Sequence, residues 1–454
     1  MIVQDKTQAS IAAGVRQSLE SMRRSGEERA VRYLAYDGRG IESMVGPYFT
    51  DRQKREAPIF KQRVCRKIID ARFCVYKSSP VRTVPDGSRY LDYIGDINQD
   101  MTYLERMTGL QGSMAMLRYF DDDEGVLDST IIPVFEPLFL PGEMEPFGVI
   151  YPLHQPGEMD KNKRRYAVWT DTEHYEVAGS GGISPALYER DKPESPTFEH
   201  GVGMLPVLFA HSGPPIGQEW MRAGADDVVN AQTVFCVQGT HLVHCTLWQT
   251  FGQPVATGVR DPKQDIRFGV DQVLALPEGA SFRFESPGGT PGIIIESMRF
   301  VIESVAHANH LQVKWASGGG ATSGEHLRMM EVDLTEALEG DEAQWMAFEK
   351  ARFALDQALL ARENIAVPDE CSVTFAPPHI PESMQEKRDQ WTWALDQRLT
   401  TKRSILKELH PGITDEALDA LMLELEESAP VQAPTVSAAP VGGFLARALA
   451  EPVQ

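Results

Sequence analysis

Two long helical patterns separated by a short strand-rich insert constrain this chain more than any other feature. Residues 225–248 (ADDVVNAQTVFCVQGTHLVHCTLW) and 290–310 (TPGIIIESMRFVIESVAHANH) each predict one continuous helix. At about 1.5 Å per residue the first helix spans roughly 36 Å. The insert contains the strand patterns PVATGV, QVLAL and SFRFES, the last with alternating apolar and charged residues. We therefore predict an antiparallel helical hairpin with a small β tip.

The sequence before the hairpin changes from helical to strand-like patterns. Residues 8–36 and 57–76 predict helices, and the second has an apolar face formed by Ile59, Val64, Ile68, Ile69 and Phe73. Residues 80–222 have a β-like pattern with many Gly and Pro breaks. Within them, RRYAVWTDTEHYEV (164–177) predicts a hairpin around Thr170–Glu173, and residues 135–153 predict further strands.

A glycine-rich loop and a long helix follow the hairpin. Thr322 and Glu325 have the spacing of a capping box, and the predicted helix continues to about Ile365, before Pro368, with Gly340 as a candidate kink. The apolar residues of this segment recur at helical spacing: Leu327, Met330, Leu334, Leu338, Trp345, Phe348, Leu355 and Leu359.

The C-terminal part is mainly helical in its sequence pattern, before a tail rich in Pro, Ala and Val. After the β-like CSVTFAPP, residues 383–428 predict two or three helices, with Pro411-Gly412 as a turn and Thr414 as an N-cap. The Pro-, Ala- and Val-rich residues 429–454 are expected to be disordered.

Composition narrows the class of protein. The 454-residue chain is 42% hydrophobic, which supports a core and two or three domains. Its formal charge of -21 argues against wrapping by nucleic acid, because that requires clustered Lys and Arg. The first ten residues carry no apolar signal region, and no apolar run reaches the roughly 18 residues of a membrane span. Five scattered cysteines fit a soluble protein in a reducing compartment.

The glycine-rich stretch KWASGGGATSGEHLRMMEVDLTEAL (314–338) raises the possibility of phosphate binding, but it does not match a nucleotide-binding loop. Gly319 and Gly324 have the glycine spacing of a P-loop. Glu325 and His326 occupy the positions where Lys and Ser/Thr are needed, and a carboxylate there would repel phosphates. We interpret the glycine-rich part of this stretch, before the long helix, as a flexible loop between two helices.

Other patterns also fail as catalytic or metal sites. GISPA (182–186) resembles a nucleophile elbow, yet Pro185 lacks the N–H that would serve the oxyanion. Cys236, His241, His244 and Cys245 cannot all converge on one metal from a single helix, so we expect packed helix faces there. DDDEG (121–125) lacks the later ligands of a calcium loop and predicts a solvated hairpin turn. We expect no catalytic residues, metal or cofactor.

The order of the parts resembles that of the portal (head-to-tail connector) proteins of tailed bacteriophages. The resemblance rests on PIFKQRVCRKIIDARFCVYKSSPV, YAVWTDTEHYEV, GMLPVLFAHSG before the first long helix and TFGQPVATGV after it. It continues through LPEGASFRFESPGG, WASGGGATSGEHLRMME and the C-terminal QWTWALDQRLTTKRSILKELHPGITDEALDALMLELEE. It covers about residues 45–428, and the glycine-rich loop with its long helix contributes most.

The resemblance implies an α+β portal fold with named parts. The wing is the β-rich 1–222 together with 311–380, which holds the tunnel loop and the long tunnel helix. The stem is helix 223–252 and helix 287–310, and the clip is the small α/β segment 253–286 between them. The crown is the helical 381–428, followed by a disordered tail, 429–454.

The same resemblance implies which residues contact DNA and the packaging motor. The tunnel loop would narrow a DNA channel with Lys314, Trp315, Ser317, Gly318, Gly319, Gly320 and Thr322. Lys314 would give one cationic contact per subunit, and the glycines keep the loop compliant with little side-chain bulk. In the clip, Arg260, Lys263 and Arg267 would contact the packaging motor or the DNA.

The expected function is structural rather than enzymatic. Portal proteins form a ring of about twelve copies at one capsid vertex, in the virion and, during assembly, in the host cytoplasm. The expected partners are further copies of the chain, double-stranded DNA, the terminase large subunit, the major capsid protein and head-completion or adaptor proteins, with no membrane. One alternative is a cytosolic enzyme with a site in residues 80–222, which predicts a monomer or small oligomer with a deep polar pocket. A second is a different ring-forming virion component, such as an adaptor, which predicts a much shorter chain without the helix–clip–helix insert.

Overall fold

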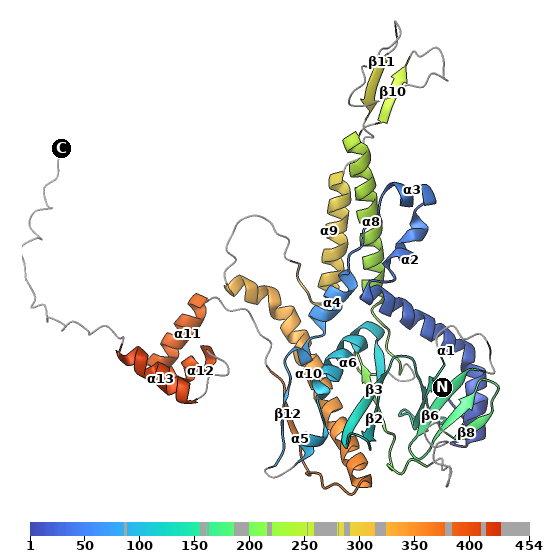
Figure 1. Ribbon diagram of the computed structural model, residues 1–454, viewed down its shortest axis with the longest axis vertical. Helices are drawn as coiled ribbons and strands as arrows, with labels where there is room; N and C mark the ends of the chain where they lie inside the picture. The colour runs from blue at the N-terminus through green and yellow to red at the C-terminus, as the bar shows by residue number, and fades with distance from the viewer. Residues whose placement is uncertain are drawn as a thin grey trace, which may run out of the picture. The chain divides into compact units, whose positions relative to one another are not determined.

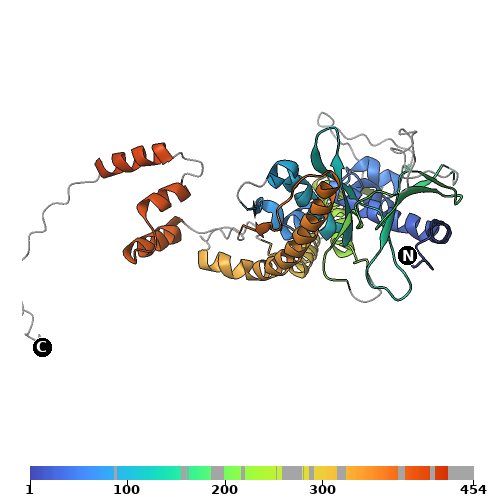
Figure 2. The same cartoon turned by 90° about the horizontal axis from the view of Figure 1, so that it is seen from below.

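The structure of the chain is a computed structural model that describes residues 1–85, 89–154, 160, 163–185, 199–215, 220–251, 253–257, 279, 281–285, 291–313, 324–376, 384–409 and 415–427. It combines helices and sheets with helix predominating, so the α+β class is confirmed (Figures 1 and 2). The chain divides into two compact units, Met1–Ala321 with His326–Ile380 and Thr322–Glu325 with Pro381–Gln454.

The first unit opens with α1 (Gln8–Asp37), the helix predicted over 8–36. Thr7 caps it by accepting a hydrogen bond from the backbone of Ser10, and Gly38 ends it with φ at 85°, a left-handed conformation that favours glycine. The apolar side of α1 packs on a five-stranded sheet, in a core cluster that includes Ile11, Val15, Met22, Ile150, Val168, Tyr175 and Val177.

This five-stranded sheet contains the predicted hairpin. Its strand order is β4-β5-β6-β7-β8, with every neighbouring pair antiparallel. The hairpin turns at Thr170–Glu173. The backbone N–H of Thr170 donates to the carbonyl of Glu173 at 2.9 Å, and the Thr170 hydroxyl accepts from the backbone N–H of Glu173 at 2.8 Å. The strands are β4 (Glu136–Leu138), β5 (Gly148–Pro152), β6 (Arg165–Thr170), β7 (His174–Ala178) and β8 (Ile183–Pro185).

A second sheet has the order β3-β2-β9. It comprises β2 (Ser113–Asp121), β3 (Val126–Ile132) and β9 (Val207–His211). The predicted hairpin turn at 121–125 is confirmed, because Asp121 accepts hydrogen bonds from the backbone of Asp123 and Glu124 between the two strands.

The β-like interpretation of residues 80–222 is wrong for the segment just after residue 89. Helices α5 (Tyr90–Tyr93) and α6 (Ile97–Gln111) occupy it, after the short β1 (Val81–Thr83). Nearly every residue in the second half of α6 is buried, so both polar and apolar positions lie inside and the one-sided pattern of a surface helix is weakened.

The helix predicted over 57–76 is also shorter in the structure. Only α4 (Val64–Arg72) is α-helical, and the 3-10 turn η2 (Val75–Lys77) follows it. Before α4, the backbone N–H of Phe60 donates to the Thr240 hydroxyl at 3.0 Å, a tertiary partner that replaces a helical one. Three short elements precede this segment: α2 (Ile41–Val45), η1 (Gly46–Tyr48) and α3 (Asp51–Glu56).

The predicted helical hairpin is present. Helices α8 (Asp226–Phe251) and α9 (Pro291–Ala308) lie side by side, and Gln238 on α8 donates a 2.7 Å hydrogen bond to Ser297 on α9 (Figure 1). At its far end β10 (Gln253–Thr257) pairs antiparallel with β11 (Ser281–Glu285), which confirms the PVATGV and SFRFES strands. The predicted strand QVLAL lies outside the described residues.

The long helix after the glycine-rich loop is α10 (Gly324–Arg362), and its helical assignment continues through Gly340, the candidate kink. The strand predicted in CSVTFAPP is β12 (Ser372–Thr374), which pairs with β1. The second unit contains three helices in its described part, as predicted: α11 (Met384–Asp396), α12 (Lys402–Leu409) and α13 (Asp415–Glu427).

Candidate functional site

The residues predicted to contact DNA or the motor lie outside the described part of the chain. This holds for Lys314, Trp315, Ser317, Gly318, Gly319, Gly320 and Thr322 in the glycine-rich loop, and for Arg260, Lys263 and Arg267 in the insert. The structure instead describes the elements on which these loops are mounted, namely the α8–α9 hairpin, the β10–β11 tip and α10.

The base of α8 is fixed in the body by buried polar contacts. Gln232 accepts a 2.9 Å hydrogen bond from the backbone N–H of Cys65 on α4 and donates one of 2.8 Å to the carbonyl of Ala35 on α1. Its side chain is almost fully buried, so the loss of these partners would leave two unsatisfied polar groups. The hairpin therefore rises from a rigid support.

Cys236, His241 and His244 of α8 make contacts within the subunit. The Cys236 thiol donates to the carbonyl of Gln62, and the ring of Phe49 lies 4.8 Å from that of His241 and 6.0 Å from that of His244. All five cysteines of the chain are free thiols. Among the described residues, three or more potential metal ligands do not gather anywhere.

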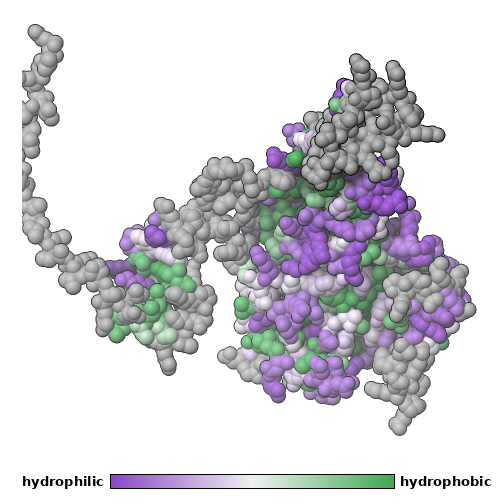
Figure 3. All heavy atoms as spheres, turned by 45° about the horizontal axis from the view of Figure 1, so that its top comes forward, coloured by the Kyte–Doolittle hydropathy of each residue, from purple (hydrophilic) through white to green (hydrophobic). Residues whose placement is uncertain are grey.

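Helix α9 carries an apolar surface that the subunit leaves uncovered. Phe300 is 71% exposed and Ile293 64% exposed, whereas Val305 and Ala306 at the base of the same helix are buried. Figure 3 shows hydrophobic surface on the side of the hairpin where α9 lies. Contiguous exposed apolar surface on a folded chain marks a contact site for a partner.

The start of the glycine-rich loop is tied to the base of the hairpin. Asn309, just after α9, donates to the carbonyl of Val305 at 2.9 Å and to the carboxylate of Asp227 on α8 at 3.4 Å. His310 has φ at 58°, so the chain turns sharply there before it enters the loop. In the sequence, the glycine-rich loop leads directly into the N-terminus of α10.

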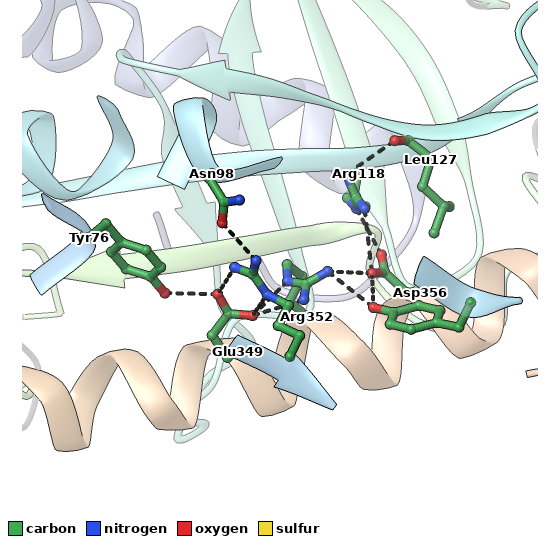
Figure 4. A network of polar contacts seen from close by, with 9 residues as sticks. Tyr76, Asn98, Arg118, Leu127, Glu349, Arg352 and Asp356 are labelled. Atoms are coloured by element: carbon green, nitrogen blue, oxygen red, sulfur yellow. Dashed lines mark hydrogen bonds and ion pairs between the residues drawn. The ribbon is translucent and has the colours of Figure 1, made fainter. Parts of the chain in front are cut away.

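Helix α10 is held in the body by a buried network of charged side chains (Figure 4). Glu349 accepts hydrogen bonds from the Tyr76 hydroxyl at 2.9 Å, from Arg82 at 2.6 Å and from Arg352 at 2.8 Å. Arg352 also donates to Asp356 at 2.6 Å, one turn further along α10. Glu349, Arg352 and Asp356 are all at most 1% exposed.

The network continues from α10 into the second sheet. Asp356 accepts from Arg118 on β2 at 2.7 Å and from the Tyr90 hydroxyl on α5 at 2.7 Å. The chain of contacts therefore links β1, α5, β2 and the 3-10 turn η2 to one face of the long helix. Because several partners hold each charge, a shift of α10 would break many hydrogen bonds at once.

Electrostatics keep this network ionised. Burial alone would raise the pKa of Glu349, but the guanidinium groups of Arg352 and Arg82 outweigh it and lower that pKa to about 2. Burial would lower the pKa of Arg352, yet the carboxylates of Asp356 and Glu349 hold it above its usual value. The pKa of the Tyr76 phenol is raised, first by burial and then by Glu349.

The sequence analysis missed this network, although a signal was present. Arg352 lies in the stripe formed by Trp345, Leu355 and Leu359, which predicted the buried face of the long helix. A charged residue at such a position, with acidic residues three before and four after it, indicates a buried ion-pair set.

In the β-rich region, one buried pair resembles a nucleophile with its base. The Ser113 hydroxyl lies 2.9 Å from Nδ1 of His211, and burial lowers the pKa of that imidazole to about 4. Ser113 is fully buried and also accepts a hydrogen bond from the backbone of Arg222, so the pair joins two strand ends. Ser184 of GISPA lies within β8 rather than on a strand-to-helix turn.

No protein-family model matches the chain, and no curated protein matches its sequence. Of the helices in the described part of the chain, none combines the length and the apolar character needed to cross a membrane. The hairpin, its tip and the long helix are therefore the features that bear on function.

Proposed function

We propose that copies of this chain assemble into a ring that acts as a portal, through which double-stranded DNA enters and leaves a viral capsid. The observation that carries this proposal is the series of parts. A helical hairpin with a β tip leads, through one glycine-rich loop, into a 39-residue helix fixed by buried ion pairs. This series gives a rigid subunit with loops at both ends of its hairpin.

Each part has a role in this portal fold. The α8–α9 hairpin is the stem, and 253–286 is the clip that docks first the terminase large subunit and then the head-completion or adaptor proteins. The body, or wing, faces the major capsid protein, and the crown, 381–428, faces the capsid interior. The loop 311–323 is the tunnel loop at the ring axis, placed there by α10.

Charge favours a channel that lets DNA slide. The chain has a formal charge of -21, so a ring of identical copies repels a polyanion from most of its surface. Contacts to the phosphate backbone read no base sequence, which suits a duplex that must move continuously. Lys314 in the tunnel loop supplies a single cationic contact per copy.

The exposed apolar side of α9 gives a reason for assembly. A lone subunit leaves Phe300 and Ile293 in water, whereas neighbouring copies around an axis would cover them. A repeated contact between two different faces of the same chain closes into a ring when its rotation divides a full turn.

Native mass spectrometry of the purified full chain tests the assembly. The portal proposal predicts a ring of about a dozen copies of the 50.5 kDa chain. Rings with one copy more or fewer would also agree with it. The enzyme alternative, with a site in residues 80–222, predicts a monomer or small oligomer, and that result would contradict the proposal.

A second experiment tests the clip. Replacing residues 253–286 by a short linker leaves the buried supports of α8 intact, so rings should still form. The same variant should lose binding to the terminase large subunit. Undiminished binding would show that the clip is not the docking element.

A further inference from the structure

A cluster of unpaired basic residues lies at the root of the hairpin. Residues 52–67 contain seven Lys or Arg and one Glu, a net charge of +6 within a chain of net charge -21. Four of the seven are occupied by ion pairs with Glu56, Asp51, Glu42 and Asp70. Arg55, Arg63 and Lys67 form no ion pair with any described residue. We call these three residues the basic face.

Two residues of the basic face, Arg63 and Lys67, line an open groove of about 740 Å³. The other lining residues are Lys61, Gln62, Arg66, Asp70 and Ala71. The backbone of the groove is fixed on α8, because the N–H of Cys65 is held by Gln232 and the N–H of Phe60 by Thr240. A partner that binds there therefore meets cations whose supporting backbone is already ordered, which lowers the entropy cost of binding.

The N-terminal half of α10 carries the opposite charge. Residues 332–342 contain five Asp or Glu and no Lys or Arg, a net charge of -5. Asp341 is paired with Arg72, but Asp333, Glu336 and Glu339 are exposed and form no ion pair with any residue that the structure describes. We call these three residues the acidic face.

The acidic face lies on a part of α10 that the body scarcely covers. Within 332–342 only Leu338 is buried, and Val332 beside the acidic residues is 46% exposed. Helix α10 pairs with the body at Asp341, through Arg72 at the end of α4. Arg55 of the basic face lies on α3, and Arg63 and Lys67 lie just before and within α4. In Figure 1, α3 and the N-terminal half of α10 lie on opposite sides of the α8–α9 hairpin, so the two faces are separate surfaces of one subunit.

We propose that the basic face of one copy binds the acidic face of the next copy, and that this charge pairing sets the direction and register of subunits around the ring. The inference rests on the proposed portal ring. A head-to-tail ring needs two different and complementary surfaces on each subunit, and these two faces meet that requirement. Complementary charge selects the correct partner surface and the rate of encounter more than it adds total affinity.

Two charge-reversed variants test the pairing. The first carries Arg55→Glu, Arg63→Glu and Lys67→Glu, and the second carries Asp333→Lys, Glu336→Lys and Glu339→Lys. Each alone brings like charges together at every interface, so the subunit concentration at which rings form should rise about tenfold or more. Mixed in equal amounts, the two variants present opposite charges at every interface of an alternating ring. Native mass spectrometry should then detect rings with equal numbers of each variant.

A matched variant controls for charge reversal itself. Asp122→Lys, Glu143→Lys and Glu145→Lys change three exposed carboxylates in the β2–β3 and β4–β5 turns, and should leave ring formation unchanged. Far-ultraviolet circular dichroism should match the wild-type spectrum for all three variants.

Distinct outcomes separate this inference from the portal proposal. The pairing would be refuted if each charge-reversed variant alone formed rings as readily as the wild type, or if the two variants stayed monomeric when mixed. Either result would leave the proposal of a ring standing. A first variant that forms rings but loses binding to duplex DNA would also refute the pairing, and would assign the basic face to nucleic acid. A wild-type chain that forms no ring would instead refute the portal proposal.

Discussion

Arg118 on β2 and Asp356 on α10 form an ion pair that is buried from solvent, with Nε and Oδ1 2.7 Å apart and both side chains at most 1% exposed. This pair fixes the long helix to the three-stranded sheet. It is also the outer end of the network through Arg352 and Glu349 to Arg82. The position of α10 therefore depends on contacts with residues that are far from it in sequence.

Removal of one partner from this pair should strongly destabilise the first unit. Arg118→Met leaves the Asp356 carboxylate buried with one partner fewer, which should cost about 3–5 kcal/mol of unfolding free energy. Urea denaturation followed by circular dichroism measures it. Arg23→Met, which removes an exposed arginine paired with Glu20 and Glu27, serves as the control and should leave the midpoint nearly unchanged. Equal effects in the two variants would show that the buried network is not a main support.

Glu105 should make stability pH-dependent. Burial raises the pKa of its carboxyl to about 7, against hydrogen bonds from the backbone of Tyr76 and Val75 that lower it. Because the folded pKa lies above the model value of 4.5, the stability gained by protonation is complete below pH 4.5 and is lost as pH rises to about 7. The loss amounts to about 1.4 kcal/mol per pH unit within that window.

The matched variant for this prediction is Glu105→Gln, which keeps an acceptor oxygen but does not titrate. The difference in unfolding free energy between wild type and variant should change across pH 4.5–7 and stay constant above it. Urea denaturation at pH 5, 6, 7 and 8 measures this difference. A difference that is the same at all four values would contradict the assignment.

Gly239 should be required where the 57–63 segment crosses α8. A Cβ atom at this position would lie 2.3 Å from the ring of Phe60, closer than any tolerated contact. Gly239→Ala should therefore destabilise the fold by about 1–3 kcal/mol, measured as a lower melting temperature. Gly340→Ala in α10 is the control: nothing lies within 4 Å of its Cβ, so it should stabilise the helix by about 0.5–1 kcal/mol. A destabilising Gly340→Ala would show that α10 needs the conformational freedom of glycine at this position.

Phe300 should matter for assembly rather than for folding. It is 71% exposed on α9, so Phe300→Ser should leave the unfolding transition of the subunit in place and weaken ring formation. Sedimentation velocity across a dilution series measures the second effect. Met144→Ser, at a 59% exposed position in the β4–β5 turn, is the control. Rings of equal stability in both variants would show that α9 faces solvent in the assembly.

The sequence predicted the elements that local pattern determines. Helices α8, α9 and α10 are long and periodic, and the β6–β7 hairpin alternates cleanly, so their type and approximate bounds were predicted correctly. Helix α6 was missed because it is buried on most sides. Residues 57–63 were assigned to a helix, although the Thr240 hydroxyl takes the backbone N–H of Phe60.

What sequence reasoning could not supply is the set of long-range partners. Arg118 and Asp356 are 238 residues apart, and local periodicity does not indicate that they meet. The same applies to the two charged faces, which are visible as charge runs in the sequence but become distinct surfaces only once α4 and α10 are placed. The predicted channel and clip residues, such as Lys314 and Arg260, stay predictions.

Electron cryo-microscopy of the purified full-length chain tests the central claim most directly. The ring proposal predicts class averages with rotational symmetry and an axial pore wide enough for duplex DNA, with the α8–α9 hairpins arranged around it. Class averages that show only single compact particles without a pore, at concentrations where the chain is folded, would contradict it.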